Sequence, residues 1–134
     1  MTKSTLFDNL ILLTKSTLLS VRSIAINVLM VVKKGNAKKR VFKGVHLDSL
    51  AVGEKSMVCK MNYQDGDFAT EHDHPHEQCG YVISGKYELT IKGETWILAC
   101  GDSYAIPGNT PHSFRVLSAG EVIDVFTPPR EDYL

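Results

Sequence analysis

The chain has 134 residues, which is enough for one domain of ordinary size and too few for two well-packed ones. Apolar residues make up 43% of it and charged residues 22%, a balance typical of a folded globular protein and not of a disordered one. Its fifteen basic and fifteen acidic residues cancel, so no overall charge attracts a polyanion, and we expect no nucleic-acid partner.

The N-terminal part, residues 1–39, is predicted to be an extension that precedes one domain at residues 40–134. Its apolar stretches, 6–13 and 24–32, are each shorter than the roughly 18–20 apolar residues that cross a bilayer. The charges fall between these stretches and no small-residue cleavage pattern follows them, which disfavours a signal peptide. We therefore expect no membrane partner.

The extension has three open interpretations. Leu6, Leu10, Leu13 and Thr17 would share one face of a helix, which could pack on the domain or on a partner. The same helix could lie on a membrane surface. The third interpretation is an over-long gene start with Met30 opening the protein, and it is favoured because every recognisable feature lies further along the chain.

The rest of the chain has the pattern of an all-β domain. Short apolar or alternating runs recur at residues 41–45, 57–61, 81–83, 87–91, 95–98, 104–106, 114–117 and 122–126. Turn residues separate them, and many short strands with regular turns predict a sandwich or a barrel. Lys92 and Gly93 are expected to form a tight hairpin turn, because glycine tolerates the positive φ that such turns require.

Three cysteines, Cys59, Cys79 and Cys100, are odd in number and lack CxxC spacing. This argues against a disulfide framework and a thiolate zinc site, and it fits the reducing cytoplasm that we expect as the location. Each cysteine is interpreted as a small apolar core residue.

A histidine-rich segment carries the candidate chemistry. His72 and His74 are two residues apart, so on a strand their side chains point to the same face, and Gln78 keeps that parity. His112 follows a second turn-rich segment that can lie opposite in a barrel. Inward polar groups are costly without a partner, so the pattern favours a metal held by these four residues.

The other histidines have less specific interpretations. His76 follows Pro75, where the chain is expected to turn, and we place His76 and Glu77 at the rim of the pocket, with plain surface as the alternative. His46 is interpreted as an ordinary core or surface histidine.

These segments resemble the two cupin motifs, of which the first is G-x5-H-x-H-x3-4-E-x6-G. Gly66, His72, His74 and Gly85 match it at the right spacing, and Gln78 stands where the family usually has Glu. Gln for Glu leaves the charge of a divalent metal uncompensated by protein, which favours an anionic ligand in the open positions.

The second motif is G-x5-P-x-G-x2-H-x3-N. Gly101, Pro107 and His112 match it, Asn109 replaces its Gly, and Val116 stands where the family has the final Asn. Asparagine tolerates the left-handed conformation, so that first replacement is mild.

The cupin resemblance covers residues 41–134 and implies a double-stranded β-helix, a jelly-roll barrel. It also implies a homodimer, because small cupins commonly pair through barrel edges. One divalent transition metal is expected, and imidazole with amide oxygen suits Fe, Mn, Ni, Co or Zn about equally.

A narrower resemblance, over residues 72–94 and 124–134, is to KdgF-type cupins, which linearise 4,5-unsaturated monouronates released from pectin or alginate. It implies a small sugar acid or other carboxylate as ligand, Arg130 pairing with its carboxylate, and Asp124 moving protons beside Phe126.

Each of these three residues also has a purely structural interpretation. Asp124 could be paired for structural reasons, Phe126 could be an ordinary core residue, and Arg130 could be a surface residue of the tail. Two other functions also stay open, namely another cupin metalloenzyme such as a dioxygenase or isomerase, and a non-catalytic cupin that binds a small ligand.

Overall fold

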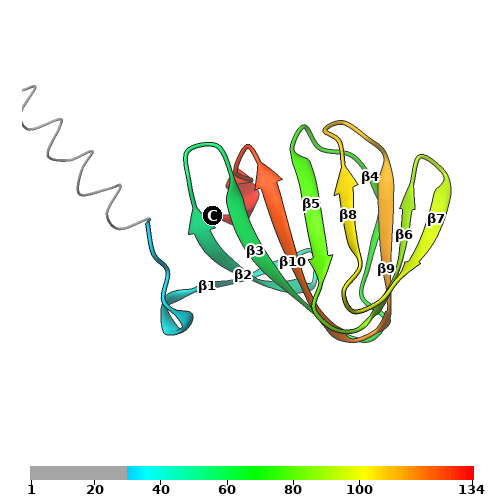
Figure 1. Ribbon diagram of the computed structural model, residues 1–134, viewed down its shortest axis with the longest axis horizontal. Coiled ribbons are helices and arrows are strands. Elements are labelled where there is room, and N and C mark those ends of the chain that lie inside the picture. Colours follow the sequence, from blue (N-terminus) through cyan, green and yellow to red (C-terminus); the bar gives the residue numbers. More distant parts are fainter. Residues whose placement is uncertain (1–29) are drawn as a thin grey trace, which may run out of the picture. The chain divides into compact units, whose positions relative to one another are not determined.

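The computed structural model describes residues 30–134, of which Val32–Leu134 form one compact unit (Figure 1). The predictions for the helix and the gene start at residues 1–29 lie outside the described residues. Within the described part, no helix is long and apolar enough to cross a membrane. The elements are η1 (Lys34–Asn36), β1 (Lys38–Phe42), β2 (Val45–Val52), β3 (Met57–Tyr63), β4 (Phe68–His72), β5 (Glu77–Val82), β6 (Lys86–Ile91), β7 (Glu94–Leu98), β8 (Ser103–Ile106), β9 (His112–Ser118), β10 (Gly120–Thr127) and η2 (Glu131–Tyr133).

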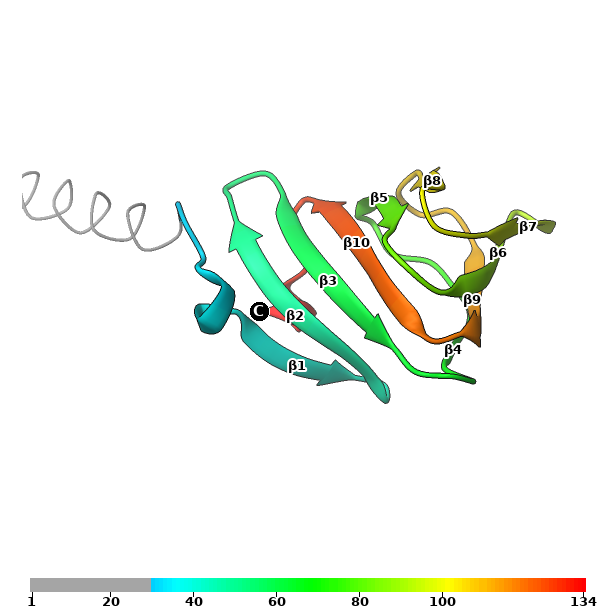
Figure 2. The ribbon, with the colours of Figure 1, turned by 60° about the horizontal axis from the view of Figure 1, so that its bottom comes forward.

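The strands form two antiparallel sheets, which Figures 1 and 2 show from two directions. One sheet has the order β1-β2-β3-β10-β5-β8 and the other the order β4-β9-β6-β7. Strand β10 lies between β3 and β5, so the C-terminal strand completes a sheet begun near residue 38. The predicted all-β jelly-roll architecture is confirmed.

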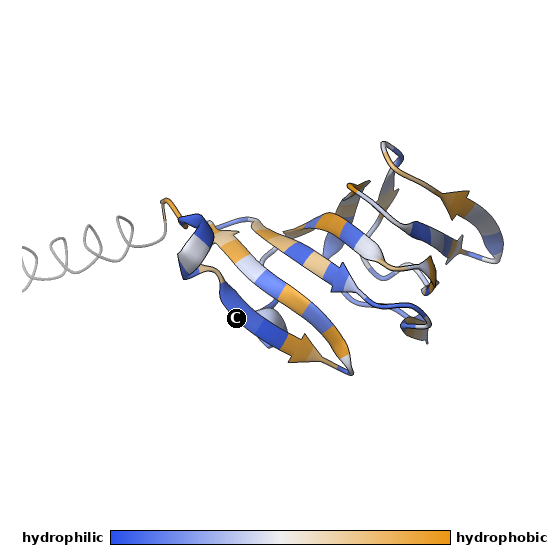
Figure 3. Ribbon diagram, turned by 90° about the horizontal axis from the view of Figure 1, so that it is seen from below, coloured by the Kyte–Doolittle hydropathy of each residue, from blue (hydrophilic) through white to orange (hydrophobic). Residues whose placement is uncertain are grey.

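Alternating hydropathy along the strands determines which face of each sheet is buried (Figure 3). In β10, Val122, Asp124 and Phe126 are buried while Ile123 and Val125 between them are partly exposed. The core lies on that inner face, where the fully buried side chains include Leu47, Met57, Cys59, Val82, Tyr87, Leu89 and Ile106. Asp124 therefore lies among apolar residues, and its charge needs a partner there.

Residues 41–45 do not form the single strand that their apolar character predicts. Lys43 and Gly44 adopt positive φ values of 48° and 84° and make a turn, so β1 ends at Phe42 and β2 begins at Val45. The hairpin predicted at Lys92 and Gly93 is confirmed, with φ values of 50° and 81° between β6 and β7.

The cysteine interpretation is correct for one residue of three. Cys59 is fully buried on β3, whereas Cys79 and Cys100 are exposed. Cys79 lies on β5 beside the buried Gly80, so strand alternation directs it outward. Cys100 lies in the turn after β7, which has no inward face.

Candidate metal centre

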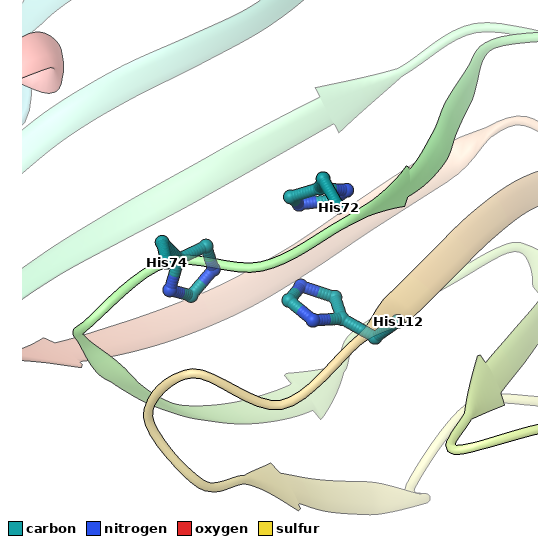
Figure 4. Close-up of side chains that lie close together, drawn as sticks. All are labelled: His72, His74 and His112. Carbon is teal, nitrogen blue, oxygen red and sulfur yellow. The ribbon is translucent and has the colours of Figure 1, made fainter.

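Three imidazole rings converge at one place between the two sheets (Figure 4). His72 ends β4, His112 begins β9 as its Cα partner across the ladder, and His74 comes from the loop after β4. The ring centroids of His72 and His112 are 4.3 Å apart, and His74 lies 5.0 Å from His112 and 5.8 Å from His72. One ring nitrogen from each lies within 4.8 Å of those of the other two.

Backbone contacts orient these rings. The Nδ1 atoms of His72, His74 and His112 lie 2.7, 3.0 and 2.7 Å from main-chain carbonyl oxygens two residues away. Because a carbonyl oxygen can only accept, each Nδ1 donates, and the Nε2 of a neutral ring carries the lone pair. The Nε2 of His74 is buried and has no hydrogen-bond partner within residues 30–134. Lone pairs held in this way fit a bound metal ion.

Burial keeps two of these rings neutral. It lowers the pKa of His74 to about 4, and the positive charge of Arg130 acts in the same direction. Burial likewise lowers the pKa of His112 below its ordinary value. A neutral imidazole is the form that binds a metal, so neither ring has to lose a proton near pH 7.

The prediction that His72, His74 and Gln78 share one face assumed that they lie on a single strand. The structure shows that they do not. Strand β4 ends at His72 and β5 begins at Glu77, with Pro75 in the loop between them. Proline has no N–H for a strand ladder, which disfavours continuing the strand through this point. Gln78 therefore lies in the other sheet, half-buried, as the Cα partner of Phe126 on β10. Its role as the fourth ligand stays a prediction.

Asp124 is fully buried on the inner face of β10. Its Oδ1 accepts a 2.7 Å hydrogen bond from the hydroxyl of Tyr104 on β8, and its Oδ2 has no partner within the described residues. Burial raises the pKa of Asp124 to about 6, although Tyr104, the Gln78 amide and Arg130 all lower it. The carboxyl can therefore hold or release a proton near neutral pH.

Arg130 is not a surface residue of the tail, since it is 7% exposed. Its Nε and Nη2 donate to Oδ1 and Oδ2 of Asp132 at 3.1 and 2.7 Å. The guanidinium carbon lies 4.1 Å from the ring centroid of Tyr133, 5.2 Å from that of Phe126 and 5.5 Å from that of Phe42. Three aromatic faces thus surround the cation and offset part of its desolvation.

Sequence reasoning missed Tyr104, Asp132 and Tyr133. Tyr104 carried a signal, since it lies in a run that was predicted as a strand and its phenol needs a partner when buried. The two tail residues carried none, because they contact Arg130 through the short helix η2 that follows the last strand.

A cavity of about 1300 Å³ opens beside the histidines. His72, His74 and Arg130 line it together with the C-terminal segment and the turn between β1 and β2. His76 lines it as well, in agreement with the predicted rim position. Among the residues that the structure describes, Asp124 is not part of this lining.

The architecture and the histidine cluster define the class of protein. Residues 59–126 match the cupin domain family, and the chain belongs to that family. It is 41% identical over 80 residues to the pectin degradation protein KdgF of Dickeya dadantii (strain 3937), an alignment that spans 58% of this chain and 72% of the relative.

Two solved structures share the fold. KdgF from Halomonas sp. superposes with a TM-score of 0.71 at 30% identity, covering 78% of this chain and 97% of that one. An RmlC-like cupin from Shewanella frigidimarina NCIMB 400 superposes with a TM-score of 0.73 at 25% identity, covering 78% and 96%. The predicted resemblance to cupins of the KdgF type is confirmed.

Proposed function

We propose that this protein is a metal-dependent enzyme that acts on a small sugar acid and linearises 4,5-unsaturated monouronates. The observation that carries the proposal is the convergence of three oriented imidazoles, two of which, His72 and His74, line a cavity that Arg130 also lines. The likeness to a pectin degradation protein supports the substrate class.

A divalent transition metal would be held by His72, His74 and His112, with Gln78 as the fourth ligand. Such an ion acts as a Lewis acid on the oxygens of a bound hydroxy-carbonyl compound. The chemistry of the donors suits Fe, Mn, Ni, Co and Zn.

The remaining groups bind and orient the substrate. Arg130 would attract the uronate carboxylate, because its planar fork matches a carboxylate in two parallel hydrogen bonds. Asp124 is buried and does not line the cavity, so it would take up and return the proton of ring opening through an intervening water, and its raised pKa suits such exchange near neutral pH. The cavity volume is ample for one monosaccharide unit.

The test is turnover of a 4,5-unsaturated monouronate by the metal-loaded full chain, with the open-chain product followed by NMR. We expect turnover by the natural chain, loss of both bound metal and turnover in His74→Ala, and loss of turnover alone in Asp124→Ala. His46→Ala is the matched control, since His46 is exposed on β2.

A chain that carries one equivalent of metal and turns over no unsaturated uronate would contradict the proposal. Binding of the uronate without turnover would instead support a non-catalytic binding cupin. Full turnover by Asp124→Ala would remove Asp124 from the mechanism.

A homodimer and a cytoplasmic location, both expected from the family and composition, stay predictions. Light scattering of the purified chain tests the first, and fractionation of cells that express it tests the second.

A further inference from the structure

Asp132 occupies the carboxylate-binding edge of Arg130. Its two oxygens accept hydrogen bonds from Nε and Nη2 at 3.1 and 2.7 Å, the paired geometry in which a guanidinium also binds a carboxylate ligand. The pairing lowers the pKa of Asp132, which is therefore charged at neutral pH.

The surroundings of Arg130 limit how else a ligand could approach it. Phe42, Phe126 and Tyr133 surround the guanidinium, and its side chain is 9% exposed. The side chain of Asp132 is 42% exposed and lines the same cavity as His72 and His74. Asp132 is thus the neighbour of Arg130 that can move away without disturbing the core.

Two carboxylates cannot share this edge of Arg130, because the second would meet the negative charge of the first at close range. We propose that Asp132 stands in for the ligand's carboxylate in the ligand-free protein, so that binding exchanges one carboxylate for another. Asp132 then sets both the affinity for acidic ligands and the preference for them over neutral ones. This inference rests on the proposed function in one respect, the binding of an acidic ligand at Arg130.

The pairing with Asp132 also provides a counter-charge for the buried Arg130 when no ligand is bound. Without an internal partner, Arg130 would be a buried charge with no counter-ion whenever ligand is absent. Asp132 supplies that counter-ion from a position two residues further along the chain, on the short helix η2, where its own side chain is partly exposed.

The test follows the Nε–H signal of Arg130 in the zinc-loaded, ¹⁵N-labelled full chain, assigned by its loss in Arg130→Lys. Acetate is titrated at constant ionic strength. In Asp132→Asn the signal should reach half of its change at an acetate concentration about tenfold lower than in the natural chain, because one charge-assisted competitor is gone.

Glu131→Gln is the matched control. It removes the same charge from the same short helix, and its side chain makes no ion pair within residues 30–134. It should respond to acetate as the natural chain does. If Asp132→Asn fails to fold, Asp132→Ser removes the charge with a smaller side chain and takes its place.

An equal or weaker response of Asp132→Asn, or no response of the Arg130 signal in any variant, would overturn the inference. Calorimetry with D-glucuronate and D-glucose then separates it from the proposed function. We expect about tenfold tighter glucuronate binding by Asp132→Asn and unchanged glucose binding. If acetate behaves as expected but no variant binds a uronate or turns one over, the proposed function fails and the role of Asp132 stands.

Discussion

The hydroxyl of Tyr104 donates a 2.7 Å hydrogen bond to Oδ1 of Asp124, across the intervening strand β5. The carboxyl is fully buried, and its other oxygen has no partner within residues 30–134. The phenol therefore stabilises the charged form of a carboxyl that its apolar surroundings disfavour.

Replacing Tyr104 by Phe should destabilise the protein by about 1–3 kcal/mol at pH 8, where Asp124 is ionised and loses a donor. The loss should be smaller at pH 5, where the carboxyl is protonated and the variant raises its pKa further. Urea unfolding at the two pH values measures both effects. Equal losses at pH 5 and pH 8 would show that the hydroxyl does not act through the charge of Asp124.

Gly80 makes room for the ring of Tyr104. A Cβ atom at Gly80 would lie 2.0 Å from the Cζ of Tyr104, far inside contact distance. We expect Gly80→Ala to cost about 1–3 kcal/mol of unfolding free energy, because the ring must leave its position. Gly35→Ala is the control, since a Cβ there meets no heavy atom within 4 Å.

A double-mutant cycle checks the cause of that cost. In a Tyr104→Ala background the ring is absent, so Gly80→Ala should cost much less than in the natural chain. The same cost in both backgrounds would place the strain elsewhere.

The stability of the metal-free protein should respond to acid through groups of opposite effect: His74 and His112, whose pKa values are lowered, and Asp124, whose pKa is raised. The pKa of His74 is lowered to about 4, so the stability that its neutral ring contributes is present above pH 6.5 and is lost as the pH falls. The pKa of Asp124 is raised to about 6, so its contribution is greatest below pH 3.8 and is lost as the pH rises. The shift of His74 and the shift of Asp124 each contribute about 3 kcal/mol to the free energy of unfolding.

As the pH falls from 6.5 to about 4.5, Asp124→Asn should therefore lose stability more steeply than the natural chain. The variant lacks the stability that protonation of Asp124 adds over this range. His74→Gln should lose it less steeply. Urea unfolding in the presence of a chelator, repeated across this range, gives the three slopes. Parallel curves for the natural chain and Asp124→Asn would contradict the raised pKa of Asp124.

Gln78→Glu tests the fourth ligand. If Gln78 contributes its side-chain oxygen to the metal, a carboxylate there adds a negative charge to the site and should raise zinc affinity about tenfold. Competition with a chromophoric chelator measures this, and Glu77→Gln, an exposed neighbour on the same strand, provides the control. Unchanged affinity in Gln78→Glu would remove Gln78 from the ligand set.

Local patterns in the sequence determined the all-β class and most of the strands. The burial of Val122, Asp124 and Phe126 follows from alternation along one strand, which depends on neighbouring residues alone. The hairpin at Lys92 and Gly93 follows from the conformational freedom of glycine. The histidines of the cluster were found for a similar reason, because both segments match motifs of fixed spacing.

Tertiary structure decided what depends on residues far apart in the chain. The three rings meet because β4 pairs with β9 and the loop at Pro75 turns His74 toward them, and not because they share a strand. Arg130 is buried because Phe42, from the first strand of the sheet, and the rings of Phe126 and Tyr133 surround it. A charge is buried only where partner groups surround it. Those partners are far apart in the chain, so a local stretch of sequence does not predict them.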